Sequence, residues 1–435
     1  MTGGAVALAA VLCYAVVAGK LDRWSVTAPF VLVAVGTVLG DSALGVLHVT
    51  ATAESIKVLA ELTLAILLFA DASTIRLREA EEDVSVPARL LGIGLPLTIA
   101  AGTVVARYLF GLSWAEAAVI GSLLSPTDAA LGLAVVTNPA VPVRIRRALT
   151  IESGLNDGIA TPFVVFFLAV AAAEADNQRW VATGVKELVV GIAFGVALGG
   201  AVGWVAARAR AAGWTTPLSQ ALIVLVTALL AYQGAVALGA NGFVSAFVAG
   251  SVFGTVSGGV LTDSTELTED VGLYASFAVW LVFGAVFVGP TLAAGLQWKP
   301  IVYAVASLTV VRMVPVALAL LGTGLRRDTV AFMGWFGPRG LASVVFTLLV
   351  FDALDASPDA VALGRIATWT VLLSVVAHGL SSGPLAAAYA RRLGRASGDV
   401  PELDDATAPR TRRRALHERH AADPGPDGRS TSTST

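Results

Sequence analysis

Cysteine is almost absent from this sequence, histidine is rare, and charged residues are scarce. The single cysteine, Cys13, excludes an internal disulfide framework and a multi-cysteine metal site. The four histidines are scattered and no HExxH motif occurs, which argues against an intramembrane zinc protease. Charged residues make up 14% of the 435 positions, whereas soluble domains carry about 25%. The composition is therefore not that of an ordinary soluble protein.

Long apolar runs fill most of the chain. Hydrophobic residues are 56% of the sequence, its mean hydropathy is +0.77, and the recurring runs of roughly 17 to 25 residues are long enough to cross a bilayer as helices. The first run has no basic residues before it and no clear cleavage site after it, so we interpret it as a span rather than a cleaved signal. We predict an all-α polytopic membrane protein with about thirteen transmembrane helices, at residues 3–19, 25–41, 56–74, 87–110, 114–137, 147–172, 182–207, 217–238, 241–258, 271–294, 299–322, 329–351 and 361–389.

The basic residues predict how these spans are oriented. Loops after odd-numbered spans carry twelve Lys and Arg residues, and loops after even-numbered spans carry six. The N-terminus is therefore expected outside the cell membrane and the C-terminus in the cytoplasm. A transmembrane domain is predicted over residues 1–392. Residues 393–435 are polar and poor in large apolar side chains, so a disordered cytoplasmic tail is predicted there.

Seven ionisable residues lie inside or at the edges of the predicted spans. At a helix centre each costs about 2.5–3.5 kcal/mol on insertion scales, so such residues tend to face a partner, water or substrate. One of them could be an accident, but five acids with two arginines indicate a site. They are Glu61, Asp71, Asp128, Glu152, Asp157, Arg312 and Arg339.

The stretch ESGLNDG, residues 152–158, holds two of these acids in the sixth span. Ser153 and Asp157 are four residues apart and share one helix face, as do Glu152 and Asn156. Glu152 and Asp157 are about 140° apart around the helix, so different tasks are expected for them. We expect Ser153 and Asp157 to face a cavity, and Glu152 and Asn156 to face neighbouring helices. The alternative is a turn, because Asn-Asp-Gly is typical turn chemistry.

Two further stretches are predicted to break their helices. LLSPTDAALG, residues 123–132, places Pro126 and Asp128 in the fifth span, and MGWFGPRGLAS, residues 333–343, places Pro338 and Arg339 in the twelfth. An ordinary proline kink and a loop between helices are the respective alternatives. Interruptions at matching places, an odd number of spans apart, favour two inverted repeats, approximately residues 1–172 and 217–390. We therefore predict two discontinuous helices that cross at the membrane midplane.

The motifs SPTDAALG, RIRRALTIESGLNDGIATP and GPRGLAS, in this order, resemble those of monovalent cation/proton antiporters of the sodium/proton exchanger type. The resemblance covers residues 1 to about 390 and implies a homodimer in the lipid bilayer. It also implies exchange of a monovalent cation for H⁺ by alternating access, with both ions competing for Asp157. Na⁺ is the first expectation, and K⁺ and Li⁺ stay open, because oxygen ligands do not choose among these ions.

The resemblance assigns roles to individual residues. It implies that Asn156 ties its helix to the first break, and that Glu152 pairs with Arg339 of the second. It gives no role to Arg312, for which a local ion pair and snorkelling at the lipid edge are both open. The implied cation-binding residues are Asp157, Ser153, Thr127, Asp128 and, on a looser match, Asp71.

Two other functions stay in view. A cation channel or uniporter could use Asp128 and Asp157 as a filter, and an intramembrane aspartyl protease could use them as a catalytic pair. The paired breaks favour the antiporter over the channel, and the ESGLND motif has no explanation in the enzyme. Because related electrogenic exchangers resemble this pattern with Asp in place of Asn156, electroneutral exchange is expected. No cofactor and no nucleic-acid partner are expected.

Overall fold

The computed structural model describes residues 3–23, 26–50, 52–74, 85–128, 131–175, 180–259, 262–395 and 401–403. Throughout these ranges the secondary structure is helical, apart from one isolated bridge between Gly40 and Leu47. The all-α prediction is confirmed. Arg76, Arg78 and Arg179, three of the basic residues counted in the predicted loops, lie outside the described residues, as does most of the tail.

The helices follow the predicted spans closely. They are α1 (Gly3–Arg23), α2 (Ala28–Leu39), α3 (Glu54–Thr74), α4 (Ser85–Arg89), α5 (Leu95–Phe110), α6 (Trp114–Leu123), α7 (Leu133–Val136), α8 (Val143–Ala175), α9 (Trp180–Ala211), α10 (Pro217–Ala237), α11 (Gly242–Val256), α12 (Glu266–Phe283), α13 (Gly289–Ala293), α14 (Trp298–Leu308), α15 (Val310–Ala319), α16 (Arg327–Trp335), α17 (Leu341–Ala353) and α18 (Pro358–Leu393). Short π-helical turns, Leu90–Gly94 and Gly284–Val288, join α4 to α5 and α12 to α13.

Thirteen spans can be counted among the described residues. Eight segments are long and apolar enough to cross a membrane, and α2, α6, α11 and α17 are shorter apolar helices. The remaining one, α3, has 21 residues and is apolar apart from a few charged positions such as Glu61 and Asp71. The predicted division of residues 217–258 into two helices is confirmed, because α10 ends at Ala237 and α11 begins at Gly242.

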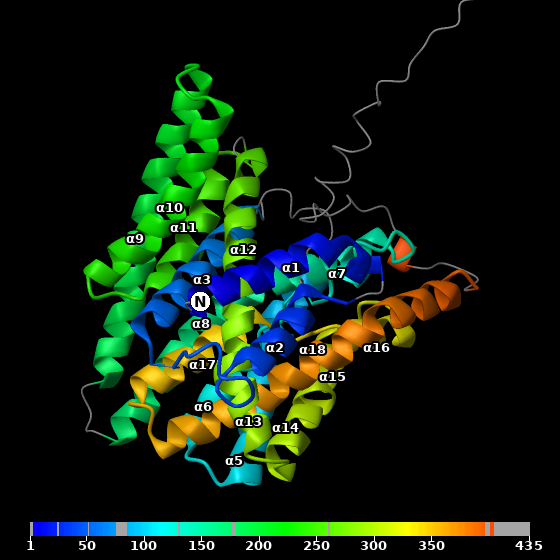
Figure 1. Ribbon diagram of the computed structural model, residues 1–435. Helices are drawn as coiled ribbons and strands as arrows, with labels where there is room; N and C mark the ends of the chain where they lie inside the picture. Colours follow the sequence, from blue (N-terminus) through cyan, green and yellow to red (C-terminus); the bar gives the residue numbers. More distant parts are fainter. Residues whose placement is uncertain are drawn as a thin grey trace, which may run out of the picture.

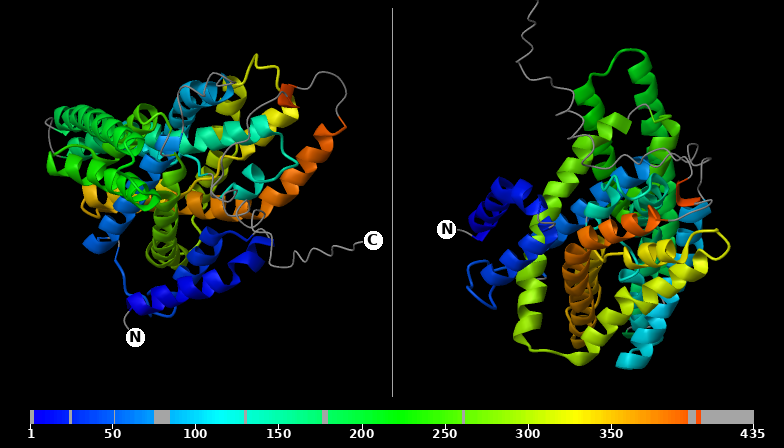
Figure 2. Two further views of the ribbon diagram at one scale, coloured as in Figure 1. Left: turned by 90° about the horizontal axis from the view of Figure 1, so that it is seen from above. Right: turned by 90° about the vertical axis from the view of Figure 1, so that its right-hand side faces the viewer.

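The helices form two groups. In the first, α3, α9, α10, α11 and α12 pack on one another, with α2 against α12; in the second, α5, α6, α8 and α14 to α18 do so. Figures 1 and 2 show α9, α10 and α11 together on one side of the molecule and α14, α15, α16 and α18 on the other. Helix α1 lies at the periphery, where it packs mainly against α2 and α12.

Glycines allow the first group to pack closely. A Cβ atom at Gly250 or Gly254 of α11 would overlap the backbone of Phe69 or Ser73 in α3. Small residues four apart let membrane helices approach to backbone contact, where van der Waals packing replaces the hydrophobic effect. Helix α3, with Asp71 in its last turn, is thereby held against α11.

Both predicted breaks are confirmed. An ordinary proline kink is wrong for the first break, and a solvated loop is wrong for the second because Arg339 is fully buried. Helix α6 ends at Leu123 and α7 begins at Leu133, while α16 ends at Trp335 and α17 begins at Leu341. Pro126 and Pro338 lie in the two non-helical stretches, where a missing N–H and a ring clash prevent continuation of the helix. The turn alternative for residues 152–158 is also wrong, because α8 is helical through the whole motif.

The described part of the predicted tail differs from the expectation of disorder. Pro401–Leu403 forms a 3₁₀ turn in which Glu402 is fully buried. The Oε1 atom of Glu402 accepts hydrogen bonds from the Arg326 N–H, at 2.9 Å, and from the Thr329 hydroxyl, at 2.6 Å. These donors at the start of α16 satisfy one oxygen of the buried carboxylate, and the composition of the tail does not reveal this contact.

Candidate functional site

The two breaks are fastened to each other around Asp128. Its backbone N–H donates to the carbonyl of Pro338, at 2.8 Å, and its Oδ2 accepts from the N–H of Leu341, at 3.1 Å. Leu341 is the first residue of α17, so the carboxylate lies at the positive end of that helix. A Cβ atom at Gly340 would overlap the Asp128 side chain, so only glycine fits at this crossing.

Arg339 provides the opposite charge at the end of α6. Its guanidinium Nη1 donates to the carbonyl of Ser125 at 2.8 Å and to that of Pro126 at 3.4 Å, and Nη2 donates to Ser307 at 3.4 Å. The side chain is fully buried. Carbonyls that follow a broken helix have no partner within it, and a cation there complements the negative helix end. Each break thus neutralises the dipole of the other.

The buried ion pair of the site joins Glu152 to Arg312. The Glu152 Oε1 and Arg312 Nη1 atoms are 2.6 Å apart, and both side chains are almost completely buried. The expected pairing of Glu152 with Arg339 is wrong, because the Arg339 guanidinium donates to the carbonyls of the first break. Snorkelling of Arg312 to the lipid edge is excluded by its burial. A Cβ atom at Gly337 would meet the Arg312 guanidinium, so the second break also accommodates this pair.

Hydroxyl groups connect α8 to the first break. The Asn156 Nδ2 donates to the Thr127 hydroxyl at 2.6 Å, and that hydroxyl lies 3.1 Å from the hydroxyl of Ser153. Asn156 and Thr127 are buried, and Ser153 is half-buried. The contact expected between Asn156 and the first break is therefore present. Ser153 and Asp128 line a cavity of about 10 Å³, which is close to the smallest space that admits a water molecule.

Asp157 lies at the junction of the two helix groups. It is half-buried on α8, one turn after Ser153. Its neighbour Gly158 lies against the ring of Phe247 on α11, where a Cβ atom would overlap the ring. Asp157 is not among the residues that line the small cavity beside Ser153. The four expected oxygen donors Thr127, Asp128, Ser153 and Asp157 thus come from the first break and the adjacent α8.

Asp71 belongs to the other group. It is half-buried in the last turn of α3, a helix that packs against both α8 and α11. Asp71 and Asp157 therefore belong to different helix groups.

The sequence reasoning missed a polar contact behind the second break. The hydroxyl of Ser374 accepts from the Arg339 N–H at 2.6 Å. The ring of His378, one turn later on α18, has Nε2 2.8 Å from the Trp335 carbonyl and Nδ1 3.0 Å from the Ser374 carbonyl. These side chains satisfy backbone groups released at the break. The sequence does hold a signal for this contact, because a serine and a histidine stand four residues apart in an otherwise apolar span.

Comparisons with known proteins agree with this geometry. The family described as "Sodium/hydrogen exchanger, transmembrane" matches residues 7–388. The K(+)/H(+) antiporter NhaP2 of Shewanella sp. (strain ANA-3) is 26% identical over 298 residues, which are 67% of this chain and 50% of that protein. The Na(+)/H(+) antiporter ApNhaP of Aphanothece halophytica is 23% identical over 337 residues, 75% of this chain and 63% of that protein.

The chain spans about half the length of the NhaP2 relatives it matches. Among solved structures, the sodium proton antiporter MjNhaP1 from Methanocaldococcus jannaschii at pH 8 is similar, with a TM-score of 0.69 at 17% identity. The match covers 89% of this chain and 98% of that chain. At this identity the likeness shows a shared fold.

Proposed function

Because the chain belongs to the sodium/hydrogen exchanger family, a family of membrane transporters, we propose that it exchanges a monovalent cation for H⁺ across the membrane. The observation that carries the proposal is Asp157, a half-buried carboxylate next to two crossed helix breaks and at the junction of two helix groups. A carboxylate there binds either a proton or a cation, and this competition couples the two fluxes.

The neighbouring donors suit an alkali cation. The Ser153 and Thr127 hydroxyls lie on the same side of α8 as Asp157 and provide further oxygen donors. Oxygen ligands favour hard cations and disfavour soft metals. We propose Na⁺ as the cation, with K⁺ and Li⁺ as alternatives, since the similar proteins include both a Na(+)/H(+) and a K(+)/H(+) antiporter.

Alternating access requires one helix group to move against the other around the site. Support comes from the packing within each group and from the form of the contact between them. At the junction, the half-buried Lys57 of α3 and the exposed Asp352 of α17 form an ion pair of 2.7 Å. Solvent reaches this pair and weakens it, so it can be broken during each cycle. We propose that α5 to α8 and α14 to α18 move as one body.

The proposed exchange is electroneutral. Asn156 occupies the position next to Asp157, and its amide is bound to the Thr127 hydroxyl, so the Asn-Asp pair contributes one titrating carboxylate. Asp128 accepts a hydrogen bond from the first residue of α17 and is assigned a structural role. Transport by reconstituted protein should then be independent of an imposed membrane potential, whereas a steep dependence contradicts a one-for-one exchange.

We further propose a homodimer with the N-terminus outside and the C-terminus in the cytoplasm. Helix α1 is available for the partner, because its apolar residues, among them Leu8 and Val16, are largely exposed at the periphery. Cys13 lies exposed on the same helix and is the only cysteine of the chain. Oxidative cross-linking of Cys13 in membranes should therefore give a covalent dimer; a Cys13→Ser variant that forms the same product would contradict this assignment.

The experiment that tests the proposed function is a pH-gradient assay in proteoliposomes. Addition of the exchanged cation should dissipate a preformed gradient. A channel would instead give cation current without an obligatory proton flux, and an aspartyl protease would give neither. Asp157→Asn should abolish the response, whereas Asp359→Asn, an exposed acid in the first turn of α18, provides a matched control for the lost charge.

A further inference from the structure

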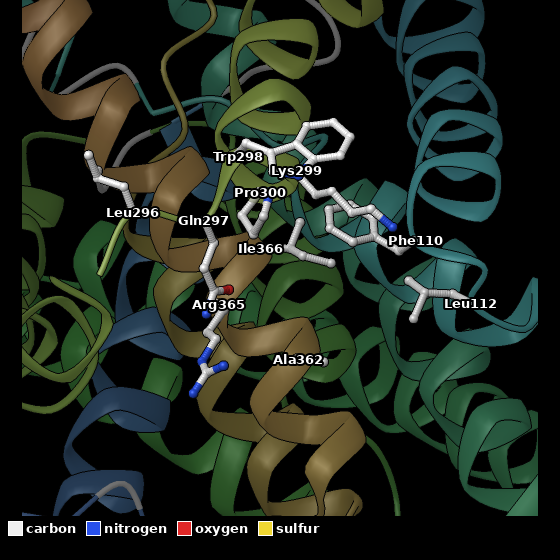
Figure 3. A pocket seen from close by; sticks show the side chains of 10 residues that line it. All are labelled: Phe110, Leu112, Leu296, Gln297, Trp298, Lys299, Pro300, Ala362, Arg365 and Ile366. Atoms are coloured by element: carbon white, nitrogen blue, oxygen red, sulfur yellow. The ribbon is translucent and has the colours of Figure 1, made fainter. Parts of the chain in front are cut away.

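A cavity of about 500 Å³ lies away from the crossed breaks, where α5 ends and where α14 and α18 begin. Figure 3 shows its lining, to which Phe110 comes from α5, Trp298 and Lys299 from α14, and Arg365 and Ile366 from α18. This volume is within the range of about 300–1,000 Å³ that small-molecule sites occupy. None of the residues assigned to cation exchange belongs to this cavity.

The charges of the lining are all positive. Lys299 and Arg365 are its two ionisable residues, and within the described ranges neither forms an ion pair with a carboxylate. The Lys299 ammonium lies 5.9 Å from the centre of the exposed Trp298 ring, within the range of a weak cation–π contact. Two cations without a protein counter-ion, at the edge of one cavity, attract an anion.

The other walls are apolar. Phe110, Ile366 and Pro300 give the cavity a hydrophobic surface, and Gln297 is its remaining polar side chain. A small hydrated anion loses solvation against such walls without gaining hydrogen bonds. A ligand that joins an anionic group to a hydrocarbon chain matches both parts of the lining.

The surroundings are those of a membrane interface. Trp298 and Trp114 are exposed at this end of the molecule, as is Tyr108. Exposed tryptophan and tyrosine side chains gather at the level of lipid headgroups. From Trp298, the exposed side chains of Val302 and Val305 continue along α14, as expected for a face in contact with acyl chains.

We propose that this cavity binds an anionic phospholipid, with its headgroup drawn by the positive charges of Lys299 and Arg365 at two edges of the cavity and an acyl chain along the exposed valines of α14. The site joins three helices of the group that carries Asp157, so the lipid stabilises that group from outside the ion pathway. The proposal does not depend on the identity of the transported cation.

The test uses the full chain purified in a neutral detergent, and it follows the apparent Tm as phosphatidylglycerol is titrated. Phosphatidylcholine and inorganic phosphate are titrated in parallel. Phosphatidylglycerol should raise the Tm in a saturable manner, because a ligand bound to the folded state stabilises it. Phosphatidylcholine and phosphate should have little effect. An equal shift with phosphate alone would contradict the lipid and indicate a site for a free anion.

The variants separate charge from shape. Lys299→Ala and Arg365→Ala should each weaken the apparent affinity about five-fold and together about 25-fold. Each basic residue contributes about 1 kcal/mol to the attraction of an anionic lipid. Ala362→Trp keeps both cations but places an indole ring in the cavity, and it should weaken saturable binding. Lys186→Ala, an exposed lysine on α9, is the control and should bind like the parent.

The Tm without lipid shows whether each variant is folded. Undiminished affinity in the double variant, or in folded Ala362→Trp, would overturn the proposal. An equal loss in Lys186→Ala would overturn it as well, because binding would then follow net charge rather than this cavity.

Discussion

The partner of Glu152 can be tested by a double-mutant cycle. At a distance of 2.6 Å and an effective dielectric constant of about 20, Glu152 and Arg312 attract each other by about 6 kcal/mol, and desolvation offsets part of this. Removal of one partner leaves the other charge buried. Glu152→Gln and Arg312→Gln should therefore each lower the free energy of unfolding by about 3–5 kcal/mol.

The double variant should lose less than the sum of these two costs, because it leaves no isolated charge. The expected coupling energy is about 2–3 kcal/mol, at the upper end for contacting residues. Reversible unfolding in mixed SDS micelles measures all four proteins. The parallel cycle with Arg339→Gln is the control, since its guanidinium binds carbonyls instead. Additive costs for Glu152 and Arg312, or a larger coupling between Glu152 and Arg339, would refute the arrangement described here.

Three further variants test the rest of the site. Asp157→Asn should fold with the stability of the parent but lose cation-dependent proton flux in proteoliposomes; residual exchange would assign the competition to another acid. Gly340→Ala should lower the Tm strongly and abolish transport, because its methyl group would overlap Asp128; a folded, active variant would contradict the close crossing. Asn156→Ala should cost about 1–3 kcal/mol in SDS unfolding through the lost bond to the Thr127 hydroxyl, and an unchanged stability would argue against that bond.

Periodicity and composition were enough to predict the helices. Apolar runs, Gly and Pro interruptions and a few charges predicted the all-helical fold, the separation of α10 from α11 and both broken helices. These features are local, because a continuous helix in a bilayer satisfies its own backbone hydrogen bonds and a proline marks where it stops. The positions of Pro126 and Pro338 in the sequence were therefore enough to predict where the two helices break.

Pairing between distant side chains could not be predicted in the same way. The choice between Arg312 and Arg339 as partner of Glu152 depends on how α15 and the second break pack against α8, and no periodic pattern encodes that packing. The support of the Arg339 backbone by Ser374 was hidden for the same reason. The buried Glu402 was missed because its donors belong to Arg326 and Thr329, far away in sequence. Composition described its segment correctly as polar, but polarity does not exclude a specific docked turn.

The most direct test of the central claim is proton flux in proteoliposomes with an imposed pH gradient, read by a pH-sensitive dye. Na⁺, K⁺ or Li⁺ is added to the wild type, to Asp157→Asn and to the Asp359→Asn control. We expect at least one cation to dissipate the gradient with the wild type and the control, and none to do so with Asp157→Asn. A wild-type protein that responds to no cation at any pH, or an Asp157→Asn variant that responds as well as the wild type, would contradict the proposed exchange at Asp157.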